Sequence, residues 1–104
     1  MENKALGLLG LARRAGKLCL GHDAVKAAVQ NGTACLCLLS CDASARLCAE
    51  IKRTTEQYGN RTKFLKTDFT MDELGHSTGS KKTAVLAVLD RGFAEKITEL
   101  IWRE

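Results

Sequence analysis

Two short apolar runs constrain the fold of this chain more than any other feature of its sequence. They span Cys35 to Ser40 and Ala84 to Leu89. A run this short does not form a helix of its own, and it is typical of a strand that is buried on both faces. Layers of helix must therefore cover both faces of the sheet to which these strands belong.

The segments around the two runs alternate between helical and extended patterns. Helix starts are marked by side chains that accept hydrogen bonds from free N–H groups, and helix ends by glycines. The segment from Thr70 to Glu73 has the form of a capping box. In chain order the predicted elements are a helix from Asn3 to Gly16, a minor strand over Lys17 to Leu20, a helix from Gly21 to Gly32, a strand over Cys35 to Ser40, a helix capped by Asp42 or Ser44 and stopped by Gly59, a strand over Lys63 to Leu65, a short helix from Thr70 to about Gly75, a strand over Ala84 to Leu89, and a last helix capped by Asp90.

This order predicts an α/β fold, a three-layer α/β/α sandwich with a small mixed four-stranded sheet. A length of 104 residues suits one hydrophobic core, so residues 1–104 are expected to form a single domain. Helical spacing also predicts which side chains are buried. The predicted stripes are Ala5, Leu6, Leu8, Leu9, Leu11 and Ala12; Val25, Ala28 and Val29; Leu47, Cys48, Ile51, Thr55 and Tyr58; and Phe93, Ile97, Leu100 and Ile101.

The charge of the chain mildly favours an acidic partner. Sixteen Lys and Arg against twelve Asp and Glu give a net charge of +4, and an excess of three positive charges falls before residue 33. No apolar run approaches the ~18 residues that a membrane-spanning helix needs, and the N-terminus has no signal-peptide pattern. The sequence therefore predicts a cytoplasmic protein without a membrane partner.

Neither metal chemistry nor catalysis is indicated by the cysteines and histidines. The five cysteines are odd in number and irregularly spaced, which argues against a disulfide framework. Only Cys37 and Cys41 have a spacing compatible with zinc, and no second pair accompanies them. His22 and His76 stand apart from any nucleophile motif, and no dinucleotide or P-loop fingerprint is present. We expect buried free thiols, no metal, no cofactor and no enzymatic activity.

A basic constellation near the N-terminus is the strongest functional candidate. Arg13, Arg14 and Lys17 follow the first predicted helix, and Gly21 opens the second helix with His22 and Asp23. A helix N-terminus that follows a glycine offers free N–H groups and a positive dipole end to a phosphate or an exposed base. The alternative is that these charges merely solvate the helix ends.

Three stretches of the sequence carry a likeness to a known family. They are Leu9 to Leu18 followed by Leu20-Gly21, Ala34 to Ala45, and Leu74 to Gly79 before Ala84 to Val88. With them, nearly the full length of the chain resembles the kink-turn-binding ribosomal protein family, the L7Ae/L30e group, and most closely its short bacterial members. The resemblance implies the same α/β/α sandwich and an RNA-binding function without a cofactor.

The resemblance also implies which residues touch RNA. Family members place the start of the second helix and the loop before the last strand against a kink-turn, a sharply bent internal loop with sheared G·A pairs. Counted from the opening glycine, the family usually has a polar or acidic third residue and a lysine at the seventh. Here Asp23 and Ala27 hold those places, and Lys26 stands one residue early. The predicted RNA-binding residues are Arg13, Arg14, Lys17, Gly21, His22, Asp23, Lys26, Ser80, Lys81, Lys82 and Thr83.

The leading prediction is a non-catalytic protein that binds structured, kink-turn-like RNA, with ribosomal or ribosome-associated RNA as the first candidate and ribosomal proteins as further partners. A protein-interaction module of the translation machinery, with the fold but without the RNA site, is an alternative. An accessory domain of a ribose methyltransferase is another, against which the length of 104 residues counts. Trp102 has two open roles, contact with a partner or closure of the core edge.

Overall fold

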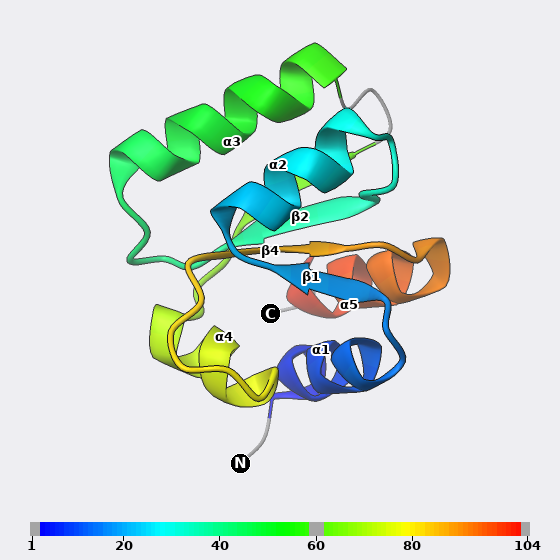
Figure 1. Ribbon diagram of the computed structural model, residues 1–104. Helices are drawn as coiled ribbons and strands as arrows, with labels where there is room; N and C mark the ends of the chain where they lie inside the picture. Colours follow the sequence, from blue (N-terminus) through cyan, green and yellow to red (C-terminus); the bar gives the residue numbers. More distant parts are fainter. Residues whose placement is uncertain (1–2, 59–61, 103–104) are drawn as a thin grey trace.

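A computed structural model describes residues 3–58 and 62–102, with only the backbone of Trp102. Helices and strands alternate along the chain as the sequence predicts (Figure 1). The elements are α1 (Lys4–Arg14), β1 (Leu18–Leu20), α2 (His22–Gln30), β2 (Leu36–Leu39), α3 (Ala45–Tyr58), β3 (Lys63–Lys66), α4 (Met71–Ser77), β4 (Val85–Val88) and α5 (Arg91–Trp102). No helix in the described ranges is both long and apolar enough to cross a membrane.

The four strands form one mixed sheet in the order β1-β4-β2-β3. β4 runs antiparallel to both β1 and β2, whereas β2 and β3 are parallel. Helices α2 and α3 cover one face of the sheet, and α1, α4 and α5 cover the other (Figure 1). The predicted three-layer sandwich with a mixed four-stranded sheet is confirmed.

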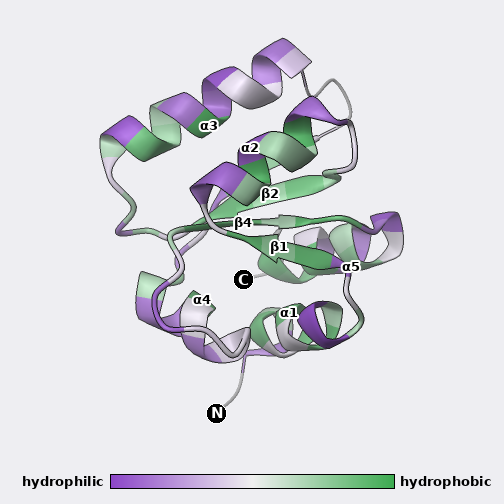
Figure 2. Ribbon diagram, viewed as in Figure 1, coloured by the Kyte–Doolittle hydropathy of each residue, from purple (hydrophilic) through white to green (hydrophobic). Residues whose placement is uncertain are grey.

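Strands β2 and β4 are buried on both faces, as their apolar runs predict. In β2, Leu36 and Leu38 join the core under α1, α4 and α5, while Cys37 and Leu39 join the core under α2 and α3. The residues of β4 alternate in the same way, because successive side chains of a strand point to opposite faces. Figure 2 shows this hydrophobic centre between helices with polar outer faces.

Most of the predicted helix caps are confirmed. Asn3 Oδ1 accepts hydrogen bonds from the N–H groups of Ala5 and Leu6, at 2.8 and 3.3 Å. Thr70 and Glu73 form the complete capping box at α4, and Asp90 caps α5. Of the two candidates for α3, Ser44 caps the helix, since its Oγ accepts from the N–H of Leu47. Asp42 instead accepts a hydrogen bond from Met71 N–H at the start of α4, at 2.9 Å.

Two side chains predicted to be buried are exposed. Leu11 is 49% exposed because it lies about 200° around α1 from the buried Leu9. Tyr58 is 50% exposed at the last residue of α3, where its phenol can meet water. The predicted helix stop at Gly59 lies outside the described residues, as does the side chain of Trp102.

The sequence predicts an end of α4 at about Gly75, whereas the helix continues two residues further, to Ser77. Gly75 is buried inside the helix, and a Cβ atom there would overlap the carbonyl oxygen of Lys81. Gly10 of α1 plays a similar role, since a Cβ atom there would lie 2.7 Å from the carbonyl oxygen of Ser77. These two glycines permit close packing of α1 on α4 and of α4 on the loop that follows it.

Candidate functional site

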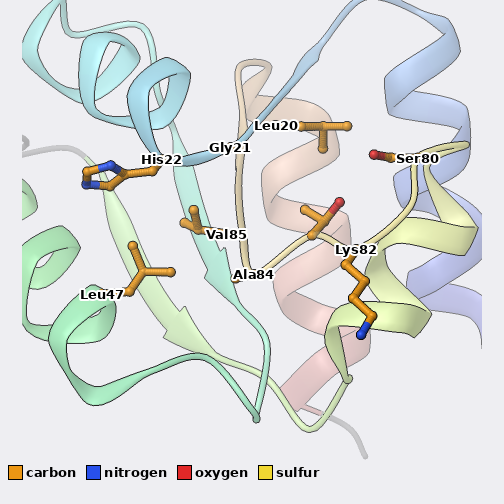
Figure 3. A pocket seen from close by; sticks show the side chains of 9 residues that line it. Leu20, Gly21, His22, Leu47, Ser80, Lys82, Ala84 and Val85 are labelled. Atoms are coloured by element: carbon orange, nitrogen blue, oxygen red, sulfur yellow. The ribbon is translucent and has the colours of Figure 1, made fainter.

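A pocket of about 300 Å³ lies where α2 begins and β4 begins (Figure 3). It combines both segments that the family resemblance singles out, the start of α2 and the loop of residues 78–84 between α4 and β4. Its lining residues are Leu20, Gly21, His22, Leu47, Ser80, Lys82, Thr83, Ala84 and Val85. Leucine, valine and alanine form its apolar part, and His22 and Lys82 come from opposite sides of it (Figure 3).

The pairing of β1 with β4 brings the two segments together. The N–H of Gly21 donates to the carbonyl of Val85 at 3.1 Å, so the end of β1 meets the start of β4. Gly21 has φ 96°, a conformation that favours glycine, and it caps α2 without a side chain. The first N–H groups of an α-helix have no partner within the helix. The start of α2 therefore presents a positive dipole end at the rim of the pocket.

Close packing against α4 holds the α4–β4 loop in place. Ser80 N–H donates to the carbonyl of Gly75 at 2.7 Å, and Thr83 N–H donates to that of Met71 at 3.0 Å. The Thr83 side chain is buried, whereas Ser80, Lys81 and Lys82 are exposed. Lys81 and Lys82 are thus carried by a loop whose backbone is anchored at both ends, and Lys82 also lines the pocket.

Asp42 lies beside the start of α4. Its pKa is lowered by the Ser40 hydroxyl, by the N–H of Met71 and by the positive charge of Lys82. Because Asp42 also accepts the hydrogen bond from Met71, its carboxylate connects the segment that follows β2 to the start of α4.

Glu50 of α3 holds two of the predicted site residues. Its Oε1 accepts a hydrogen bond from Lys26 Nζ at 3.0 Å and lies 3.0 Å from His22 Nε2. The hydrogen bond from Lys26, followed by the contact with His22, lowers the pKa of Glu50. Asp23 Oδ1 lies 3.5 Å from His22 Nδ1, and the Asp23 side chain is fully exposed. Because its Nζ donates to Glu50, Lys26 faces α3.

The predicted basic constellation is divided into two parts by β1. Leu89 N–H donates to the carbonyl of Lys17 at 2.8 Å, so Lys17 lies at the opposite end of the β1–β4 pair from Gly21. Arg13 and Arg14 end α1 near Lys17 and are exposed. Four strand steps of about 3.3 Å separate Lys17 from Gly21. These three basic residues are therefore not part of the pocket.

The cysteines follow their expected burial only in part. All five are free thiols: Cys37 is buried, Cys19, Cys35 and Cys48 are partly buried, and Cys41 is exposed. Burial, with a smaller contribution from Cys19, raises the pKa of Cys37 to about 12. Among the described residues, no group of three or more His, Cys, Asp or Glu side chains could hold a metal ion.

Thiol alkylation tests this arrangement. At pH 8, iodoacetamide is expected to modify the exposed Cys41 at least about tenfold faster than Cys37, because a thiol with a pKa near 12 has almost no thiolate at that pH. Mass spectrometry of peptides at successive times gives the rates, and urea-unfolded protein provides the control. Equal rates in the folded protein would contradict the burial of Cys37.

Comparison with known proteins matches this chain to one family. A family model described as the ribosomal protein L7Ae/L30e/S12e/Gadd45 family matches residues 3–98. The RNA-binding protein YlxQ of Bacillus subtilis is 36% identical over 98 residues, which cover 90% of this chain and 91% of the relative. YlxQ of Enterococcus faecium is 35% identical over 100 residues, which cover 96% and 93%.

Solved structures agree with these matches. A protein of unknown function from Bacillus halodurans C superimposes with a TM-score of 0.87 at 35% identity, covering 96% of this chain and 98% of the other. The 15.5 kD RNA-binding protein of Giardia lamblia has a TM-score of 0.76 at 16% identity, covering 94% and 82%, a likeness of fold alone. The matched range of the family model includes both segments that line the pocket.

Proposed function

Because the chain belongs to the ribosomal protein L7Ae/L30e/S12e/Gadd45 family, we propose that it is an RNA-binding protein whose site is the pocket between α2 and the α4–β4 loop. One observation carries the proposal: the two segments that family members place against RNA lie 59 positions apart, from Gly21 to Ser80, and line one pocket here. The family is non-catalytic, so we expect no turnover.

The chemistry of the pocket suits a bent internal loop of RNA. Protein side chains and free N–H groups recognise RNA best where bases are unstacked and splayed out. Leu20, Leu47 and Val85 give the pocket an apolar part that can receive such a base, and Lys82 and the start of α2 can contact the phosphates on either side. A straight duplex offers phosphates but no splayed base. We therefore propose a kink-turn-like RNA as the ligand.

The natural RNA is proposed to be ribosomal or ribosome-associated, with ribosomal proteins as neighbours and the cytoplasm as the place of action. Two relatives from Bacillus subtilis and Enterococcus faecium are named RNA-binding proteins. The basic balance of the chain, +4 overall, supports a polyanionic partner.

A protein-interaction module is the second candidate, and one observation favours it. Ala27 stands at the position where the family usually has a lysine, and Lys26 cannot replace that lysine because it pairs with Glu50 on α3. One residue step rotates a helical side chain by about 100°. A direct test of RNA binding at α2 separates the two candidates.

Two substitutions in α2 test the proposal. Asp23→Ala is expected to lower the preference for a kink-turn over a straight duplex by about tenfold, since an ionised carboxylate accepts hydrogen bonds from base amino groups. Ala27→Lys is expected to tighten kink-turn binding by about five- to tenfold. Dissociation constants are measured by gel shift with a kink-turn duplex and a fully paired duplex of equal length.

Matched variants control for charge alone. Gln30→Lys adds the same charge at another exposed position of α2. It is expected to strengthen binding to both RNAs weakly and by the same factor. Asp23→Asn keeps an acceptor and is expected to retain part of the preference. An unchanged preference in Asp23→Ala, together with no effect of Ala27→Lys, would favour the protein-interaction candidate.

A further inference from the structure

Glu50 of α3 makes two charged contacts beside the pocket, and the proposed function does not account for them. Its Oε1 lies 3.0 Å from both Lys26 Nζ and His22 Nε2, and these two residues belong to the first turns of α2. The Glu50 carboxylate thus contacts two nitrogens of α2 that would otherwise be available to an RNA phosphate.

The arrangement is partly shielded from water. The exposed side-chain fractions are 40% for His22, 33% for Lys26 and 36% for Glu50, so salt screens this cluster less than it screens a fully exposed pair. The Glu50 carboxylate is ionised at neutral pH, and its contact with Lys26 lowers its pKa further. Lys26 consequently has its charge matched within the protein before any RNA approaches.

A phosphate at this position would compete with Glu50. Contacts to phosphates carry no sequence or shape information of their own, and they strengthen binding to every RNA alike. Lys81 and Lys82, by contrast, are exposed on the α4–β4 loop and form no ion pair within the described part of the chain, although the charge of Lys82 acts on Asp42. Attraction that does not distinguish one RNA from another is therefore reduced mainly on the α2 side.

We propose that Glu50 is a specificity-determining residue, an internal anion that withholds Lys26 and His22 from RNA phosphates so that contacts inside the pocket decide which RNA binds. The proposal rests on the proposed function, because it concerns the same pocket and the same ligand. Removing the negative charge is then expected to help a straight duplex more than a kink-turn.

The test compares Glu50→Gln with Glu56→Gln, which removes the same charge from an exposed position of α3 away from Lys26. The probes are a duplex with a kink-turn loop and a fully paired duplex of equal length. Glu50→Gln is expected to tighten binding to the paired duplex about five- to tenfold and binding to the kink-turn no more than about twofold. It is also expected to steepen the salt dependence of binding by roughly one unit. Glu56→Gln is expected to change both RNAs by the same factor, below about twofold.

A double variant identifies the cation. Lys26→Met combined with Glu50→Gln is expected to remove the gain for the paired duplex. Glu50→Asp, which keeps the charge but shortens the side chain, is expected to show a smaller change in the same direction. Thermal unfolding of each variant verifies that the fold is retained.

Failure of the role proposed for Glu50 can be told apart from failure of the proposed function. A wild-type protein that binds neither RNA overturns the proposed function and this proposal with it. A wild-type preference for the kink-turn that stays the same in Glu50→Gln as in Glu56→Gln overturns the role of Glu50 alone. Weaker binding of both RNAs by folded Glu50→Gln also overturns it, since Glu50 would then support binding.

Discussion

Replacing Gly75 with alanine is expected to lower the free energy of unfolding by about 3 kcal/mol, at the upper end of overpacking effects. A Cβ atom at this position would overlap the carbonyl oxygen of Lys81, and a backbone atom cannot move aside as a flexible side chain can. For a domain of this size the loss corresponds to a melting temperature lower by more than about 10 °C. Thermal and urea unfolding followed by circular dichroism measure the effect.

Gly7→Ala is the matched control, because nothing lies within 4 Å of a Cβ atom at this exposed helical position. It is expected to stabilise the protein by up to about 1 kcal/mol through helix propensity. If Gly75→Ala were as stable as the wild type, the loop of residues 78–84 would not be packed on α4 as described. A folded Gly75→Ala protein is expected to lose the kink-turn preference, since the displaced loop forms one side of the pocket.

Replacing Lys81 and Lys82 together with alanine is expected to weaken binding to kink-turn RNA by about 10- to 100-fold at 0.1 M salt and to reduce the salt slope by roughly two units. Both side chains are exposed on the loop, and Lys82 also lines the pocket. Titrations at several salt concentrations by fluorescence anisotropy give both quantities.

Arg13→Ala combined with Arg14→Ala is the comparison for that pair, because it removes the same charge beyond the far end of β1. Arg14→Ala is expected to weaken binding to both RNAs alike and to reduce the salt slope by about one unit. A larger loss from the arginine pair than from the lysine pair would place the RNA at the other end of the sheet, contrary to the proposal.

Local sequence patterns were sufficient to predict the order of the elements. The apolar runs of β2 and β4 and the caps at Asn3, Thr70 and Asp90 depend on neighbours within a few residues. The predicted end of α4 falls two residues short because glycine usually stops a helix, whereas Gly75 is required by a carbonyl oxygen six positions further along the chain. The stop signal and the close-packing signal look alike in a sequence.

The site depends on contacts that no local pattern contains. The resemblance supplied both segments of the pocket, but the pattern had grouped Arg13, Arg14 and Lys17 with Gly21 because they are close in sequence. The pairing of β1 with β4 separates them. Glu50 was missed because the contact with His22 joins residues 28 positions apart, and nothing in its own helix distinguishes it from other glutamates.

Strand β4 gives both halves of the pocket a common support. Gly21 is hydrogen-bonded to Val85, and the α4–β4 loop continues covalently into the same residue, so the separation between the α2 start and the loop is set by one buried strand. Because the width of the pocket is nearly fixed, the RNA must change its shape to fit it. Affinity would then vary with how readily an RNA bends, and base pairs that never touch the protein would contribute to recognition through their stiffness.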